Sequence, residues 1–130
     1  MTKNPVIAIV DDDTSVRVAT TCLMRSLGYV ALGFASAEEF LGSPHLGEAA
    51  CLIADVQMPG MSGIELQRSL IAQGCDIPVI LISAFPAERL KAVRVLGADA
   101  VRFLNKPFDT KNLLDCLEAA LRSRGKSVVE

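Results

Sequence analysis

The sequence of 130 residues has no tryptophan, one tyrosine and one histidine, and it has little net charge. A formal charge of -2 gives no basic footprint of the kind that nucleic-acid binding needs, so we expect no direct nucleic-acid contact. No apolar run approaches the length of a membrane span, and the start of the chain does not resemble a signal peptide. We therefore expect a cytoplasmic protein without membrane contact.

Cysteine and histidine are too few and too scattered to suggest a metal or redox motif. Four cysteines occur, none in a C-x-x-C pair, so we expect reduced thiols without zinc or redox chemistry. The single histidine, His45, lies in a stretch that contains Gly42, Pro44 and Gly47, which is typical of a loop. We assign it no role.

Apolar residues, in contrast, make up 51% of the chain, enough for a substantial core in one domain. We expect that domain over residues 1–125, followed by a frayed tail over 126–130. Five apolar runs predict strands at 6–10, 29–34, 51–55, 79–83 and 101–104. Five helical patterns alternate with them, at about 15–27, 36–42, 63–73 and 86–96 and after Asp109. Such alternation predicts a doubly wound α/β fold with a parallel sheet of flavodoxin-like order 2-1-3-4-5.

Polar side chains follow four of the predicted strands. Asp11, Asp12 and Asp13 follow the first, Asp55 ends the third, Ser83 ends the fourth and Lys106 follows the fifth. In open parallel sheets ligands bind at the carboxyl ends of the strands, so these groups should converge there. Clustered carboxylates repel one another, and magnesium held by oxygen ligands is the natural compensation.

This set of groups suits phosphoryl transfer to a carboxylate. One aspartate can act as the nucleophile, a lysine can neutralise phosphoryl oxygens, and a serine can donate a hydrogen bond. Each group also has a simpler explanation: the acidic run can cap the next helix, and a lone Asp, Ser or Lys-Pro commonly marks a turn. The functional interpretation depends on the joint pattern.

Four motifs together resemble the bacterial response-regulator receiver domain. They are Ile9-Val10-Asp11-Asp12-Asp13, the stretch Asp55-Val56-Gln57-Met58-Pro59-Gly60-Met61-Ser62-Gly63, Ile82-Ser83-Ala84 and Lys106-Pro107-Phe108. The resemblance covers nearly the whole chain, and the second motif is highly specific. The segments around Ser83 and Lys106 look closest to the subgroup that often regulates nitrogen fixation or related transcription.

The resemblance implies a role for each matching residue around the metal. Asp55 is the phosphoacceptor and a magnesium ligand, and Lys106 is the lysine that contacts the phosphoryl group. Asp12 binds the ion directly, Asp11 binds it mainly through water, and the backbone carbonyl of Gln57 completes the protein's ligands.

It also implies a switch at the end of the fourth strand. Ser83 is the switch hydroxyl, Ala84 admits the phosphodonor, Phe103 is the switch aromatic, and the peptide bond before Pro107 is cis. Serine stands where threonine is commoner, and the stretch from Ser83 to Lys106 is about one residue longer than usual.

The resemblance further implies a phosphorelay signalling switch with a sensor histidine kinase or phosphotransfer protein as its partner. Such a domain is not an enzyme beyond its own phosphorylation and dephosphorylation, and it allows a homodimer formed on phosphorylation. Three alternatives remain. One is a receiver fold that binds proteins without phosphorylation, and another is a magnesium-dependent phosphatase of the haloacid dehalogenase type. A flavodoxin-type electron carrier is disfavoured because acids stand in place of its phosphate loop and aromatics are few.

Overall fold

The computed structural model describes residues 5–98, 101–106 and 108–129, with side chains described up to residue 122. The strands are β1 (Val6–Val10), β2 (Val30–Phe34), β3 (Cys51–Asp55), β4 (Val79–Ser83) and β5 (Arg102–Asn105). The helices are α1 (Thr14–Ser26), α2 (Ala37–Leu41), the short 3-10 helix η1 (Leu46–Glu48), α3 (Gly63–Ala72), α4 (Pro86–Leu96) and α5 (Thr110–Val129).

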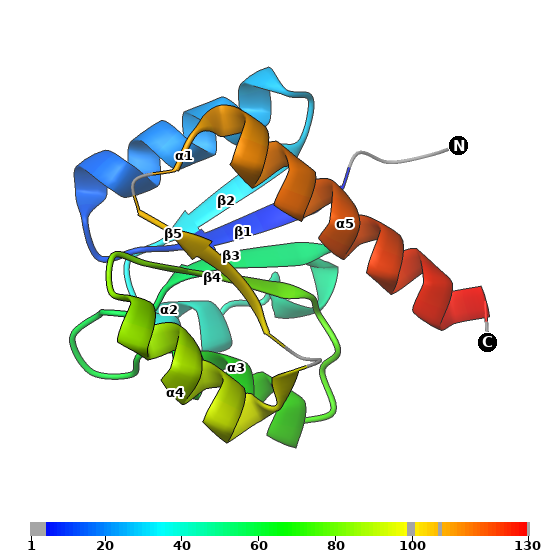
Figure 1. Ribbon diagram of the computed structural model, residues 1–130. Coiled ribbons are helices and arrows are strands. Elements are labelled where there is room, and N and C mark those ends of the chain that lie inside the picture. The colour runs from blue at the N-terminus through cyan, green and yellow to red at the C-terminus, as the bar shows by residue number, and fades with distance from the viewer. Residues whose placement is uncertain (1–4, 99–100, 107, 130) are drawn as a thin grey trace.

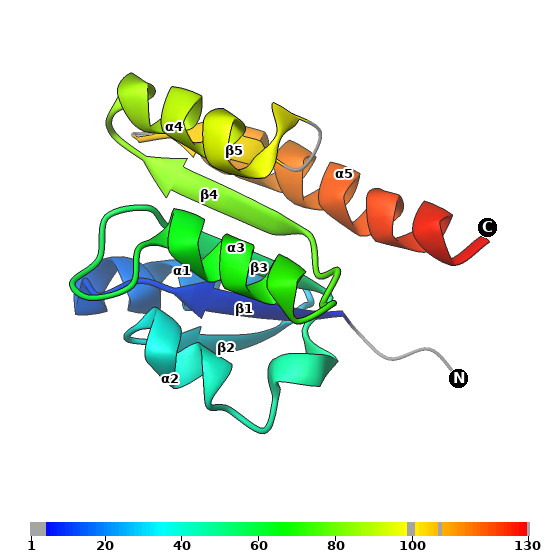
Figure 2. The same cartoon turned by 90° about the horizontal axis from the view of Figure 1, so that it is seen from below.

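The five strands form one parallel sheet in the order β2-β1-β3-β4-β5, as the sequence predicts. Figure 1 shows α1 and α5 on one face of this sheet and α2, α3 and α4 on the other, and Figure 2 shows the same layers from below. Helices on both faces follow from parallel strands, because each crossover must return along the sheet.

The central strands are buried on both faces and divide the core in two. In β1, Ile7 and Ile9 face the cluster beneath α1 and α5, whereas Ala8 and Val10 face the cluster beneath α2, α3 and α4. This alternation arises because successive side chains of a strand point to opposite faces. Burying each large aliphatic side chain contributes about 1.5–3 kcal/mol to stability, so the sheet is a firm support for the loops at its edge.

Polar side chains at the N-termini fix where most helices begin. The Asp13 carboxylate accepts hydrogen bonds from the backbone N–H groups of Ser15 and Val16, so the capping interpretation of the acidic run holds for this residue. Ser62 and Glu65 form a reciprocal capping box at the start of α3. Helix α4 begins differently, with Pro86 in its first turn after the apolar residue Phe85.

The remaining differences from the sequence prediction are local. Strand β5 is displaced by one residue toward the C-terminus, and η1 was not expected. Helix α5 extends to Val129, and the division into a domain over 1–125 and a frayed tail remains a prediction. Within the described part of the chain, no helix is long and apolar enough to cross a membrane.

Candidate functional site

The register of the sheet brings the polar strand ends together. Val10 pairs with Ala54 and Asp55 pairs with Ile82, so the residue after β1 lies level with the end of β3. The backbone N–H of Lys106 donates to the Ser83 carbonyl at 2.9 Å, which places the lysine beside the end of β4. We call Asp11, Asp12, Asp55 and Lys106 the acidic site.

Asp55 lies at the centre of the acidic site and is only 8% exposed. One carboxylate oxygen, Oδ1, accepts the backbone N–H of Gln57 at 2.9 Å, and the other, Oδ2, accepts from Lys106 Nζ at 2.5 Å. Both oxygens are therefore oriented by donors, and the side chain has a defined direction at the sheet edge.

The backbone at the end of β3 is in close contact with the start of α3. The first residue of α3, Gly63, donates its N–H to the Val56 carbonyl at 3.0 Å. A Cβ atom at Gly63 would lie 2.5 Å from the carbonyl oxygen of Asp55, far inside van der Waals contact. Only glycine permits α3 to begin this close to the end of β3.

Lys106 supplies the positive charge of the site. Partial burial alone would lower its pKa, but the hydrogen bond and the charge of Asp55 act more strongly in the other direction. The pKa of Lys106 is therefore raised above its ordinary value, and the ammonium group stays charged at neutral pH.

The two acids after β1 differ in their surroundings. Asp11 is 6% exposed, and burial raises its pKa by more than the hydrogen bond from the Asp13 N–H lowers it, while the Asp55 charge adds a further rise. Asp12 is exposed. The Arg17 guanidinium, which the sequence analysis did not single out, donates to the Asp11 backbone carbonyl at 2.7 Å and holds this loop against α1.

The donor set fits a hydrated hard cation. Carboxylates with a backbone carbonyl, completed by water, are what magnesium prefers, and the buried Asp11 beside Asp55 carries charge that a cation would compensate. No group of three His, Cys, Asp or Glu side chains able to hold a metal ion is found among the described residues. The direct ligation by Asp12 and by the Gln57 carbonyl therefore remains a prediction.

Ser83 is 2% exposed and is turned toward the start of α4. Its hydroxyl oxygen accepts the backbone N–H of Phe85 at 3.0 Å, and its O–H donates to the carboxylate of Glu88. The sequence analysis missed Glu88. The available signal was its position three residues after Phe85, where a helix starting at Pro86 places an acidic side chain in the first turn.

The other predicted switch residues differ in how far they are buried. Phe103 pairs with Leu81 in the sheet and is half-buried against the core cluster beneath α2, α3 and α4. Ala84 is exposed. Pro107 lies outside the described residues, so the expected cis peptide bond remains a prediction.

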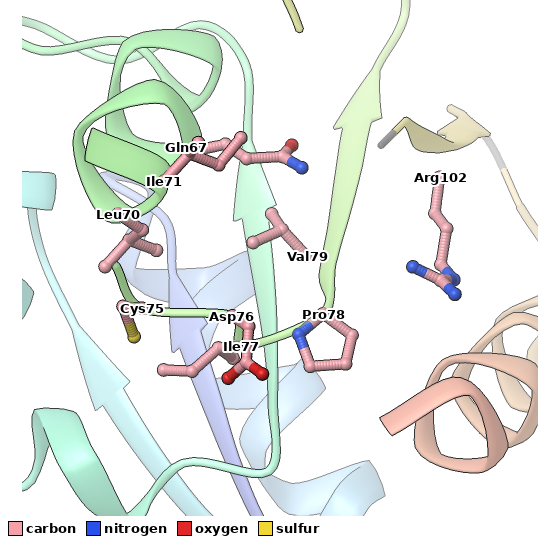
Figure 3. Close-up of a pocket in the computed structure, with 9 residues that line it drawn as sticks. All are labelled: Gln67, Leu70, Ile71, Cys75, Asp76, Ile77, Pro78, Val79 and Arg102. Carbon is pink, nitrogen blue, oxygen red and sulfur yellow. The ribbon is translucent and has the colours of Figure 1, made fainter. Parts of the chain in front are cut away.

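A separate cavity of about 170 Å³ lies at the opposite edge of the sheet, near the start of β4 and β5. Figure 3 shows the Gln67 amide extending into it from α3, with Asp76 and Pro78 before β4 and Arg102 on the far side. Because ligands of parallel sheets bind at the carboxyl ends of strands, this cavity is not the candidate site.

A doubly wound sheet whose carboxyl edge holds paired acids and a lysine defines a receiver-type α/β domain. The model of the family "Response regulator receiver domain" matches residues 7–118, and the chain belongs to this family. Receiver domains are signalling domains of two-component systems rather than enzymes in their own right.

Named relatives agree with this assignment. "Response regulator protein TodT" of Pseudomonas putida is 43% identical over 117 residues, which cover 90% of this chain and 51% of TodT. "Transcriptional regulatory protein FixJ" of Bradyrhizobium diazoefficiens is 34% identical over 122 residues, which cover 94% of this chain and 59% of FixJ. The chain thus spans about half the length of the curated relatives that it matches.

A solved structure of a response regulator is also similar to this chain. The response regulator TrrA from Thermotoga maritima, described as a complex with Mg(2+)-BeF, has a TM-score of 0.78 and 25% sequence identity. The match covers 90% of this chain and 99% of TrrA. The fold of this chain is therefore one on which a magnesium–beryllofluoride complex has been described.

Proposed function

We propose that Asp55 accepts a phosphoryl group from the phosphohistidine of a sensor histidine kinase or a phosphotransfer protein. The observation that carries this proposal is the contact of Asp55 Oδ2 with Lys106 Nζ at 2.5 Å, beside the buried Asp11 at the carboxyl edge of the sheet. A nucleophile, a positive charge and an acidic neighbour thus come from three separate segments of the chain.

The reaction requires little more than positioning and charge. An Asp55 carboxylate oxygen forms the new O–P bond while the N–P bond of the phosphohistidine breaks and the imidazole departs with the electron pair. The Lys106 ammonium neutralises charge on the phosphoryl oxygens. Magnesium, when held by Asp11, Asp12, Asp55 and the Gln57 carbonyl, would supply further positive charge. Hydrolysis of the acyl phosphate by the same residues ends the signal.

Phosphorylation then shifts an equilibrium between two states. The acyl phosphate adds close to two negative charges, and Ser83 turns to donate to a phosphoryl oxygen. Phe103 moves further inward, and the surface of α4, β5 and α5 is reshaped. A nearly complete shift needs about 5 kcal/mol, which two or three charge-assisted hydrogen bonds of roughly 1.5–3 kcal/mol each can supply.

The partners are inferred from the named relatives. The named relatives are response and transcriptional regulators, so we propose a histidine kinase upstream and a transcriptional output in the same pathway. A homodimer formed on phosphorylation is part of this proposal, and it predicts a larger hydrodynamic size in the presence of magnesium and beryllofluoride.

Labelling by a small phosphodonor tests the proposal. Incubation with phosphoramidate and magnesium should add one phosphoryl group by intact mass, and chelation of the metal should prevent it. Asp55→Asn should abolish the labelling, whereas the matched control Asp76→Asn, at an exposed position, should label normally. Full and persistent labelling of the Asp55 variant would refute the assignment.

A further inference from the structure

The hydroxyl of Ser83 is fully engaged at the start of α4 rather than free at the acidic site. It accepts the N–H of Phe85 at 3.0 Å and donates its only proton to the Glu88 carboxylate, with the Phe85 carbonyl oxygen as a more distant second acceptor at 3.5 Å. With 2% exposure, it has little opportunity to exchange these partners for water. The receiver switch described above, however, needs this same proton.

A hydroxyl donates to one acceptor at a time, so Glu88 and a phosphoryl oxygen would compete for Ser83. Both acceptors are anionic, and hydrogen bonds to charged groups are the stronger kind. The interaction with Glu88 must therefore be broken before Ser83 can turn toward Asp55. This competition links the acidic site to the first turn of α4.

We propose that Glu88 is a positioning residue that holds Ser83 in the unphosphorylated arrangement and releases it when Asp55 is phosphorylated. The proposal rests on the proposed function and adds the group that opposes the switch. It also gives α4 a direct part, because Glu88 occupies the first turn of this helix and is freed as Ser83 leaves.

The expected size of the effect follows from population shift. In the released state, Ser83 is no longer bonded to Glu88. If an anion binds only to this state, its apparent affinity is its intrinsic affinity multiplied by the fraction of molecules in the released state. If Ser83 is bonded to Glu88 in most molecules, removal of Glu88 should strengthen the binding of a phosphoryl mimic by about three- to tenfold.

Beryllofluoride binding to the whole chain, followed by ¹H–¹⁵N NMR at saturating magnesium, tests this proposal. Glu88→Ala should lower the half-saturating beryllofluoride concentration by about three- to tenfold. Glu88→Gln keeps a neutral acceptor and should give a smaller gain, about twofold. In a Ser83→Ala background, Glu88→Ala should have no effect, because the competing proton is already absent.

Glu65→Gln is the matched control. Glu65 occupies the same third position of its helix as Glu88 and bonds within the α3 capping box. Glu65→Gln should leave beryllofluoride binding unchanged. Thermal unfolding of both variants measures any loss of stability that follows from removing an acidic side chain from the first turn of a helix.

The possible failures are distinguishable. A wild-type chain that does not respond to beryllofluoride and is not labelled would overturn the proposed function, and this proposal with it. A normal wild-type response with unchanged binding by the Glu88 variants would overturn this proposal alone. An equal gain in the Ser83→Ala background would also overturn it, because Glu88 would then act only by repelling the anion.

Discussion

Helices α3 and α4 lie on the same face of the sheet but are anchored very differently. Five residues of α3 are buried, including Leu66 and Leu70, and a capping box closes its N-terminus. In α4, all of whose residues are described, only Ala92 is buried, and Leu90 is 66% exposed. Asp55, the proposed phosphoacceptor, therefore precedes a firmly packed helix, and Ser83, the proposed switch residue, precedes a lightly packed one.

This contrast indicates how one domain can both hold a reactive group and respond to it. Regions with few buried apolar contacts open and shift at lower free energy than the packed core. The proposed function requires a fixed geometry at Asp55, which lies before α3, and two arrangements of Ser83, which lies before α4. Lys106, which contacts Asp55 from the end of β5, connects the two regions.

The largest effect is expected from breaking that connection. Lys106→Met removes the charge that contacts Asp55 and should slow phosphorylation by phosphoramidate by more than about 100-fold. The control Lys111→Met removes an exposed lysine that pairs with Asp115 and should label at the wild-type rate. Comparable rates for both variants would show that Lys106 does not act on the phosphoryl group.

Leucine truncation tests the difference in anchoring directly. Leu66→Ala in α3 should lower the free energy of unfolding by about 2–5 kcal/mol, because it leaves a cavity in the core. Leu90→Ala in α4 should change it by less than about 0.5 kcal/mol. Urea denaturation followed by circular dichroism measures both, and similar losses would remove the contrast between the helices.

A smaller effect is expected from Asp11, the buried acid beside Asp55. Its pKa is raised by burial, so the folded state binds the proton more tightly than the unfolded chain. Ionised Asp11 therefore destabilises the fold at neutral pH, and this cost is relieved as the pH falls through the raised pKa.

In the presence of a chelator, Asp11→Asn should thus unfold at a higher urea concentration than the wild type at neutral pH. Its advantage should shrink on acidification, while exposed Asp76→Asn should show no such trend. An advantage that grows on acidification would mean that the folded state holds the Asp11 proton less tightly than the unfolded chain, contrary to the effect of burial.

The smallest effect is expected at the end of the chain. We propose that residues 1–125 form the domain and that residues 126–130 fray. Deleting 126–130 should therefore change the unfolding free energy by less than about 0.5 kcal/mol and leave labelling intact. A substantial loss in either measurement would place these residues in the folded unit.

The sequence predicts the central strands of the sheet better than the edge strand β5. The bounds of β1, β3 and β4 agree with the prediction because continuous apolar runs mark strands that are buried on both faces. Strand β5 is only half-buried, so its pattern is weaker and its predicted position is off by one residue. The convergence of Asp11, Asp55 and Lys106 follows from a parallel sheet of flavodoxin-like strand order, which the sequence analysis predicts.

Contacts that depend on side-chain direction could not be predicted in this way. The bond between Ser83 and Glu88 requires the bend at Ala84 and the start of α4 at Pro86 to be placed together. The bond from Arg17 to the Asp11 carbonyl likewise requires a long side chain to fold back along α1. The spacing of residues along the chain indicates which face of a helix or which edge of the sheet a residue occupies. It does not indicate which acceptor a flexible side chain will bond to.

The close approach of Gly63 to the Asp55 carbonyl has a mechanical consequence. Because the first residue of α3 lies against the backbone of Asp55, a tilt or slide of this helix would move Asp55, the proposed phosphoacceptor, with it. Under the proposed function, a partner that displaces α3 would also displace Asp55, whereas a partner that binds α4 would act on the site through Glu88 and Ser83.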